Sequence, residues 1–179
     1  MSEERYRIMR EYSRVDATIP LGITVIGEDE KDMRKARIAG DMTFGNVPAE
    51  EPTDRALAEW LKIINSKLDY LINLWSFHQE GFSCLPIYEV NISGGGMSFN
   101  SDVCYEEGKV LELKTVLESP SSIALYLYGE VVKCEKLKDK DKFRVALKFI
   151  NIDEDIRDHI IRFVFHRQRQ ILRQKREIK

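Results

Sequence analysis

The sequence lacks the features that mark membrane, disulfide-rich and metal-binding proteins. Its unbroken apolar runs are only a few residues long, whereas a membrane-spanning helix needs about 20. Residues 1–14 contain no apolar stretch of the kind found in a secretion signal. The three cysteines, Cys84, Cys104 and Cys134, are widely spaced. This pattern predicts reduced thiols in a cytoplasmic protein, two or three of them buried in or near strands, and not a disulfide framework or zinc site.

The sequence also has little excess charge of either sign. Its 28 Lys and Arg residues are balanced by 30 Asp and Glu residues, for a formal net charge of -2. We therefore expect no DNA binding by the chain as a whole, because nonspecific attraction to a polyanion needs a positive field. The length of 179 residues and the hydrophobic fraction of 43% predict a single domain over residues 1–179.

Arrangements typical of catalysis are lacking as well. The three histidines, His78, His159 and His166, have no metal-ligand spacing with one another or with the cysteines. No acid pair and no nucleophile with a neighbouring base stands out. The sequence predicts a protein that is not an enzyme and has no metal and no cofactor.

What the sequence does contain begins with a long helix, predicted over residues 53–80. Thr53 is expected to cap its start and Gly81 to end it. The apolar positions follow a heptad pattern with steps of four and three, at Leu57, Leu61, Ile64, Leu68, Leu71 and Trp75. Such a pattern favours self-association into a homo-oligomer, although packing of the helix on its own domain remains the alternative.

Residues 86–150 switch to a period of two, which is typical of strands with one buried face. Phe143, Val145, Leu147 and Phe149, for example, alternate with polar or small residues. Several such strands with short turns predict a small antiparallel barrel. A first strand is expected over residues 17–26, at an edge or bulge because it contains Pro20. Residues 27–52 are expected to form a long connection, with a short strand near residues 34–38.

A C-terminal helix is predicted over residues 154–179. Its buried stripe is expected at Ile156, Ile160, Phe163 or Val164, and Ile171. Residues 157–179 hold eight basic residues and two acidic ones, a local charge of +6. A solvated, fraying end is the favoured interpretation, and a patch for nucleic acid or anionic lipid is the alternative.

Two short elements are candidates for ligand binding. The first is an Arg-x-x-x-Arg element at Arg10 and Arg14, where two guanidiniums in a segment outside the sheet suit phosphates and guanine edges. The second begins with Asn91 and Ser93, whose side chains can fix a turn. It continues with Gly94, Gly95 and Gly96. These three glycines permit positive φ and leave backbone amides uncovered for a planar ligand.

The ordered pair of elements resembles the PilZ domain family. That resemblance implies a six-stranded antiparallel barrel that binds cyclic di-GMP. The helix predicted over residues 53–80 would be a long insertion in this barrel. The resemblance also implies that Arg10 and Arg14 hold phosphates and guanines, and that a guanine is received by Asn91, Ser93, Gly94, Gly95 and Gly96. The stretch from Tyr128 to Val132 is similar to the family's Gly-x-Val-Val strand, and residues 165–176 to its closing helix.

The resemblance implies a cyclic di-GMP effector. We expect the Arg10–Arg14 segment to be mobile without ligand and to close over the glycine turn when ligand binds. The output is a surface for an unknown downstream protein in bacterial motility, attachment or polysaccharide export. A departure from the family is the long interval of residues 15–90 between the two elements. A subgroup with long helices is tetrameric, and some of its members do not bind the ligand. The alternative is therefore a non-binding oligomeric adaptor.

Overall fold

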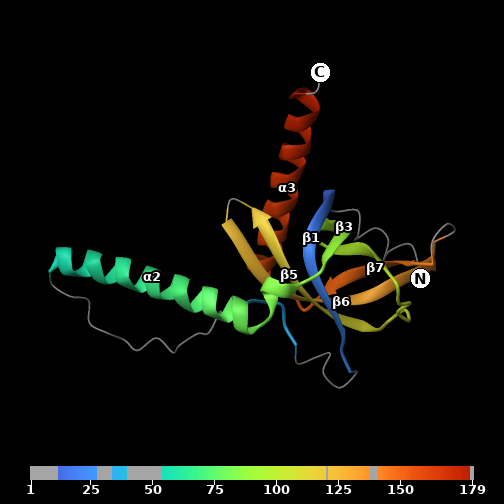
Figure 1. The fold of residues 1–179 in the computed structure, drawn as a ribbon, viewed down its shortest axis with the longest axis horizontal. Helices are drawn as coiled ribbons and strands as arrows, with labels where there is room; N and C mark the ends of the chain where they lie inside the picture. The colour runs from blue at the N-terminus through green and yellow to red at the C-terminus, as the bar shows by residue number, and fades with distance from the viewer. Residues whose placement is uncertain (1–11, 28–33, 40–53, 120, 138–140, 178–179) are drawn as a thin grey trace.

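The computed structural model describes residues 12–27, 34–39, 54–119, 121–137 and 141–177. The core of the molecule is a six-stranded antiparallel barrel (Figure 1), as the sequence predicted. Its strands are β1 (Arg14–Val25), β3 (Ile87–Ser93), β4 (Gly96–Ser101), β5 (Val110–Ser119), β6 (Ser121–Lys136) and β7 (Phe143–Ile150).

The barrel closes because β6 pairs with both β5 and β7. Going around the wall, the strand order is β6, β5, β1, β3, β4 and β7, which returns to β6. The two-residue strand β2 (Arg37–Ile38) attaches to the side of β6, so the short strand expected near residues 34–38 is present. Residues 28–33 and 40–53 of the long connection lie outside the described residues.

Strand β1 differs from the expectation of an edge or a bulge, since its pairings show no shift of register. Its first half pairs with β3, ending at Pro20, and its second half pairs with β5, beginning at Leu21. The strand therefore lies within the wall and changes partner at the proline. The Pro20 nitrogen donates no ladder hydrogen bond. The Pro20 carbonyl accepts a 2.8 Å hydrogen bond from the Thr115 hydroxyl at this changeover.

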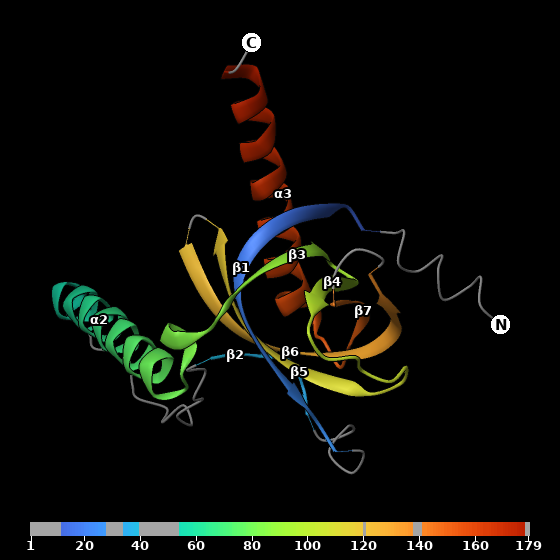
Figure 2. The same ribbon diagram turned by 45° about the vertical axis from the view of Figure 1, so that its right-hand side comes forward.

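Helix α3 (Glu154–Glu177) covers one end of the barrel and continues beyond it (Figures 1 and 2). Its predicted stripe is confirmed at Ile156 and Ile160, and both Phe163 and Val164 are buried. Ile171 is partly buried and packs against the same core. The barrel core, to which these helix residues belong, includes the fully buried Leu21, Leu113, Leu127, Val145 and Leu147.

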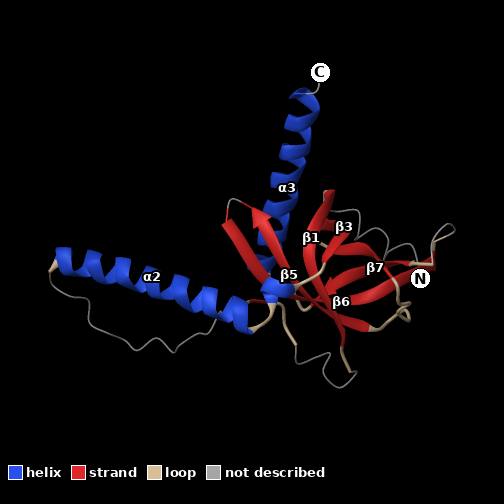
Figure 3. Ribbon diagram, viewed as in Figure 1, coloured by secondary structure: helices blue, strands red, loops and turns tan. Residues whose placement is uncertain are grey.

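Helix α2 (Arg55–Gln79) extends away from the barrel (Figure 3). Asp54 caps its start, because its carboxylate accepts the amides of Ala56 and Leu57 at 2.9 and 3.3 Å. The predicted cap, Thr53, lies outside the described residues. The predicted stop at Gly81 is confirmed, with a left-handed φ of 76°.

The C-terminal end of α2 attaches to the barrel through aromatic contacts. Phe77 stacks on Phe82 in the short 3-10 helix η2 (Phe82–Cys84), with ring centroids 5.7 Å apart. Phe82 in turn meets the edge of Tyr126 on β6 at 5.2 Å. An ion pair between Arg37 and Glu80 lies beside this contact. The helix is thus fixed at its base while the rest of it projects.

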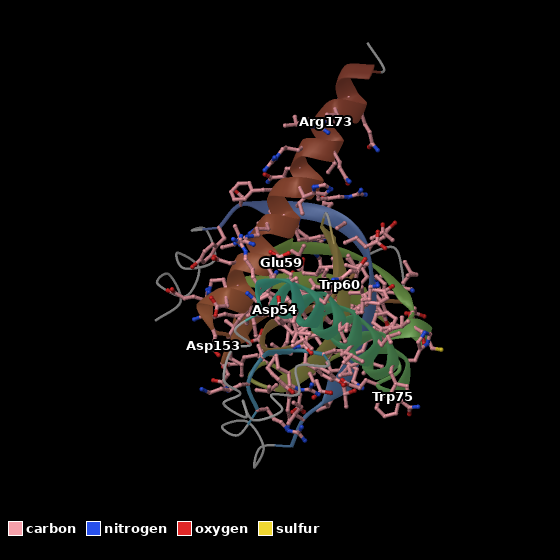
Figure 4. The ribbon with its side chains drawn as sticks, turned by 90° about the vertical axis from the view of Figure 1, so that its left-hand side faces the viewer. Asp54, Glu59, Trp60, Trp75, Asp153 and Arg173 are labelled. Carbon is pink, nitrogen blue, oxygen red and sulfur yellow. The ribbon has the colours of Figure 1, made fainter. Side chains whose placement is uncertain are left out.

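The heptad surface of α2 is exposed along the helix. The six seam positions, Leu57, Leu61, Ile64, Leu68, Leu71 and Trp75, are all between 41% and 62% exposed. Trp60, Ile63 and Leu74 are exposed as well, and Figure 4 labels both tryptophans on this helix. The alternative that the helix packs on its own barrel is therefore wrong for this chain.

The cysteines differ from the prediction of burial. Cys84 and Cys104 are exposed and Cys134 is half-buried, and only Cys134 lies in a strand. Among the described residues, no helix has the length and hydropathy needed to cross a membrane. The same part of the chain holds no cluster of three or more His, Cys, Asp or Glu residues arranged for a metal ion.

Candidate ligand site

The two predicted elements meet at the end of the β3–β4 hairpin. Arg14 is the first residue of β1 and pairs with Ser93, the last residue of β3. Ser93 pairs in turn with Gly96, the first residue of β4. Arg14 therefore belongs to the sheet, which corrects the expectation that it lies in a segment outside it. Arg10 lies outside the described residues.

The side chains of the hairpin hold its turn in place. The buried Ser93 hydroxyl donates to the Gly96 carbonyl at 3.2 Å and accepts the Gly95 amide at 3.4 Å. This is the local bonding that the sequence predicted for the serine. Asn91 behaves differently, since its amide donates to the Asp16 carboxylate on β1 at 2.8 Å. It therefore ties two neighbouring strands together and does not fix the turn.

The glycines are required for close approach and not for positive φ. Among the described residues, the glycines with a left-handed φ are Gly81 and Gly108, so the expectation of positive φ for the turn is wrong. A Cβ at Gly96 would overlap the backbone carbonyl of Leu147 on the neighbouring strand. A Cβ at Gly94 would lie 2.9 Å from Cδ1 of Tyr12. Tyr12 covers the glycine surface that we expected to be open.

Tyr12 and α3 hold the described end of the first element. The Tyr12 ring packs over Gly94 and Gly95. The Arg157 guanidinium lies 5.5 Å from the centre of that ring and donates to the Tyr12 hydroxyl and the Gly94 carbonyl, both at 3.4 Å. Gln168 donates to the Arg14 carbonyl at 3.0 Å. Arg157, which we had counted with the solvated basic tail, is part of this site.

Beside this hairpin lies a cavity of about 260 Å³ in the outer wall of the barrel. It is lined by Arg14, Asn91, Ser93, Gly96, Met97, Ser98, Val132, Lys133, Glu135, Arg144 and Ala146. Pockets that enclose a drug-sized molecule measure about 300–1,000 Å³. This cavity therefore accommodates part of a larger ligand, with the rest of the ligand on the barrel surface.

A second cavity of about 280 Å³ continues along the same wall. It shares Asn91, Ser98 and Arg144 with the first and adds Arg167 from α3. Arg144 lies between the two cavities and donates to the Ser98 hydroxyl at 3.4 Å. The strand alternation around Phe143 and Val145 placed Arg144 on the outer face, which was the signal that could have identified it. A third cavity, of about 560 Å³, lies beside α3 and contains none of the predicted site residues.

A family model for the PilZ domain matches residues 75–166, slightly more than half of the chain. The chain belongs to the PilZ domain family. The matched region contains the glycine turn and most of the barrel, and it begins after the Arg10–Arg14 element. No curated protein matches the chain.

The PilZ fold is supported by similarity to a solved structure of a pathogenic protein from Xanthomonas campestris. That structure is described as a new tetrameric PilZ domain that self-assembles through an unusual helical bundle. The two chains share 16% identity with a TM-score of 0.54, over 96% of this chain and 99% of the other. At this identity the likeness shows the fold alone. The roles of individual residues in binding stay predictions.

Proposed function

We propose that this PilZ protein is a cyclic di-GMP-binding effector. The observation that carries the proposal is that Arg14 of β1 lines the same cavity as Asn91, Ser93 and Gly96 of the β3–β4 hairpin, which is distant from it in sequence. These are four of the seven residues predicted to bind the ligand. Of the other three, Gly94 and Gly95 form the adjoining turn, and Arg10 lies four residues before Arg14.

The chemistry of the cavity suits this ligand. Cyclic di-GMP carries two phosphate charges and two guanines. A guanidinium can pair in a fork with phosphate oxygens or with the O6 and N7 atoms of guanine. Arg14 and Arg144 both line the cavity, whose size suits one purine. The Lys133 ammonium lies next to the Glu135 carboxylate, which reduces the repulsion of an anion by that carboxylate.

The contacts of Tyr12 refine the expected conformational change. We expected the whole Arg10–Arg14 segment to be mobile without ligand, but residues 12–14 contact the turn and α3. Tyr12 therefore serves as an anchor, and ligand-dependent rearrangement is proposed for the part that precedes it, which includes Arg10. The rearranged segment would present a new surface to a downstream protein. The setting is the bacterial cytoplasm, in motility, attachment or polysaccharide export.

Isothermal titration calorimetry with purified cyclic di-GMP tests the proposal. Removing a hydrogen-bond partner of a charged group costs about 1.5–3 kcal/mol, which corresponds to roughly 10- to 100-fold in affinity. We expect Arg14→Ala and Ser93→Ala to weaken binding on this scale. Arg173→Ala is the matched control, because Arg173 is exposed near the far end of α3 (Figure 4).

Two results would contradict the proposal. The first is the absence of heat when the wild-type protein is titrated with the ligand. The second is an equal loss of affinity in Arg14→Ala and Arg173→Ala, which would indicate nonspecific attraction to positive charge. Because the Ser93 hydroxyl also holds the turn, the unfolding temperature of Ser93→Ala separates a lost ligand contact from a lost hairpin.

A second function, that of an oligomeric adaptor, is favoured by the exposed seam of α2. Its six seam positions and the adjacent Trp60, Ile63 and Leu74 form a broad apolar surface, wider than a two-stranded coiled coil requires. The solved structure from Xanthomonas campestris is described as tetrameric through a helical bundle. We propose that α2 assembles in a similar way with α2 of other copies.

Sedimentation over a range of protein concentrations tests the assembly. We expect a species of several times the 20.9 kDa chain mass. A single 20.9 kDa species at every concentration would contradict the adaptor proposal and leave the ligand proposal unaffected. Ligand binding without assembly would support the effector alone, and assembly without binding would support the adaptor alone.

A further inference from the structure

Cys104 and Cys134 are separated by 30 positions in the sequence, yet their sulfur atoms lie 2.8 Å apart. Cys104 is exposed in the connection between β4 and β5, whereas Cys134 is half-buried in β6. A disulfide bond is about 2.05 Å long, so the two sulfurs are already close to bonding distance. Both cysteines are free thiols in this structure.

The connection that carries Cys104 is held against the barrel on both sides of the cysteine. On one side, the Val103 amide donates to the Ser101 hydroxyl at 3.0 Å. On the other side, the Gly108 amide donates to the Val131 carbonyl of β6 at 2.8 Å. The approach of the two sulfurs is therefore built into the fold, and bond formation requires little movement of the backbone.

We propose that Cys104 and Cys134 form a reversible intramolecular disulfide and so constitute a redox-modification site. Exposed disulfides are typically the labile, regulatory kind and not the structural kind. Lys133 and Glu135, on either side of Cys134, line the cavity beside the β3–β4 hairpin. The pairing of β6 with β7 also shifts register between Val131 and Lys133. The bond would thus attach the β4–β5 connection to the part of the cavity wall that directly follows this irregularity.

The oxidant is a low-molecular-weight disulfide such as oxidised glutathione. The thiolate of Cys104, the more exposed of the pair, attacks one sulfur of that disulfide and displaces one small thiolate. Cys134 then attacks the Cys104 sulfur of the mixed disulfide and displaces the second. The two protons of the protein thiols pass to the two released thiols. The protein is oxidised by two electrons, and one small disulfide is reduced to two thiols.

The surroundings of Cys104 fit slow exchange with such a disulfide. Its pKa is raised by the hydrogen bond with Cys134, by partial desolvation and by electrostatic interaction with Cys134 and Glu106. A raised pKa leaves little thiolate at neutral pH, and the thiolate is the reactive form. The pair is therefore suited to equilibrate with a thiol–disulfide pool, and not to react rapidly with traces of peroxide.

Thiol counting on the full-length protein tests the proposal. The protein is equilibrated with glutathione buffers from reducing to oxidising, quenched with acid and labelled with a maleimide under denaturing conditions for mass spectrometry. Wild type should bind three labels when reduced. When oxidised it should bind one label or none, according to whether the exposed Cys84, which contacts Ser83 and not a second cysteine, carries glutathione. The Cys84→Ser variant should bind two labels and then none. Returning oxidised protein to the reducing buffer should restore the full number.

The single variants Cys104→Ser and Cys134→Ser provide the controls. Each of these variants keeps Cys84 and one cysteine of the pair. Neither variant should form an internal disulfide when oxidised. Digestion without reductant should give a linked peptide pair containing Cys104 and Cys134 from oxidised wild type. Two labels on oxidised Cys84→Ser, or a stable glutathione adduct on Cys104 in wild type, would overturn the proposal. A stable adduct would show that Cys134 does not attack the Cys104 sulfur and displace the glutathione.

Discussion

The barrel and helix α2 have similar apolar side chains but place them in opposite environments. In the barrel, residues such as Leu127 and Leu147 are fully buried. On α2, chemically identical side chains such as Leu61 and Leu68 are 41% and 49% exposed. The barrel wall also closes on itself through the pairing of β6 with β7, whereas α2 contacts the rest of the chain at its C-terminal end.

The difference indicates that one region buries its apolar surface within a single chain and the other leaves it for contact with a second chain. One copy is sufficient to bury the apolar face of the barrel, so the barrel can fold as a unit. One copy leaves the seam of α2 in water, which costs free energy in proportion to the exposed apolar area. The barrel is thus expected to carry the stability of the monomer, and α2 to carry its association. Matched substitutions in the two regions can separate these contributions.

The largest effect on stability is expected from truncation in the barrel core. Leu147→Ala should lower the free energy of unfolding by about 2–5 kcal/mol, because the cavity left by the side chain is only partly refilled. Leu68→Ala makes the same chemical change at an exposed position of α2 and should cost less than about 1 kcal/mol in the monomer. Urea unfolding at low protein concentration measures both. Equal losses in the two variants would contradict the division into two regions.

A smaller loss is expected when the closure of the barrel is disturbed at the candidate site. In Gly96→Ala the new methyl group would meet the Leu147 carbonyl on β7, and such overpacking typically costs about 1–3 kcal/mol. Gly27→Ala is the control, because nothing lies within 4 Å of a Cβ there. Thermal unfolding compares the two. An unchanged midpoint for Gly96→Ala would show that β4 and β7 can separate without loss of the fold.

The smallest effect on barrel stability is expected from charges in the α2 seam. The double variant Ile64→Glu with Leu68→Glu should change the free energy of unfolding of the barrel by no more than about 0.5 kcal/mol. Its sedimenting mass should nevertheless fall to that of one chain, since carboxylates are costly to bury. Lys62→Glu is the control for added charge, because it changes the net charge by the same amount at an exposed polar position of the helix. A double seam variant that keeps the wild-type mass would show that assembly does not use this surface.

The sequence predicted those parts of the fold that local periodicity determines. The alternation around Val145 identified barrel strands, and the heptad spacing from Leu57 to Trp75 identified α2. It did not show that β1 changes partner at Pro20, because a proline in a strand pattern equally suits an edge. Nor did it show whether α2 folds back on the barrel, since the heptad spacing is the same in both arrangements.

The candidate site was predictable where residue type determines geometry and not where packing does. Ser93 bonds within the turn as expected of a serine there. The contact of Tyr12 with Gly94 was missed. The sequence pattern of a hairpin glycine is the same whether the glycine is exposed or covered by an aromatic ring. Arg157 was missed because it is one of eight basic residues in the C-terminal segment, and only the fold distinguishes it from the others.

The contacts that α3 makes with the first element have a mechanical consequence. Arg157 and Gln168 join the helix to Tyr12 and Arg14. Ile171 is partly buried against the core, and the C-terminal end of the helix extends past the barrel (Figure 1). From Arg157 to its end the helix is about 30 Å long at about 1.5 Å per residue. A tilt of about 5° at that base would move the tip by roughly 3 Å, as in a lever of that length. A shift too small to alter the barrel would in this way appear at the far end of the helix as a displacement the size of a side chain.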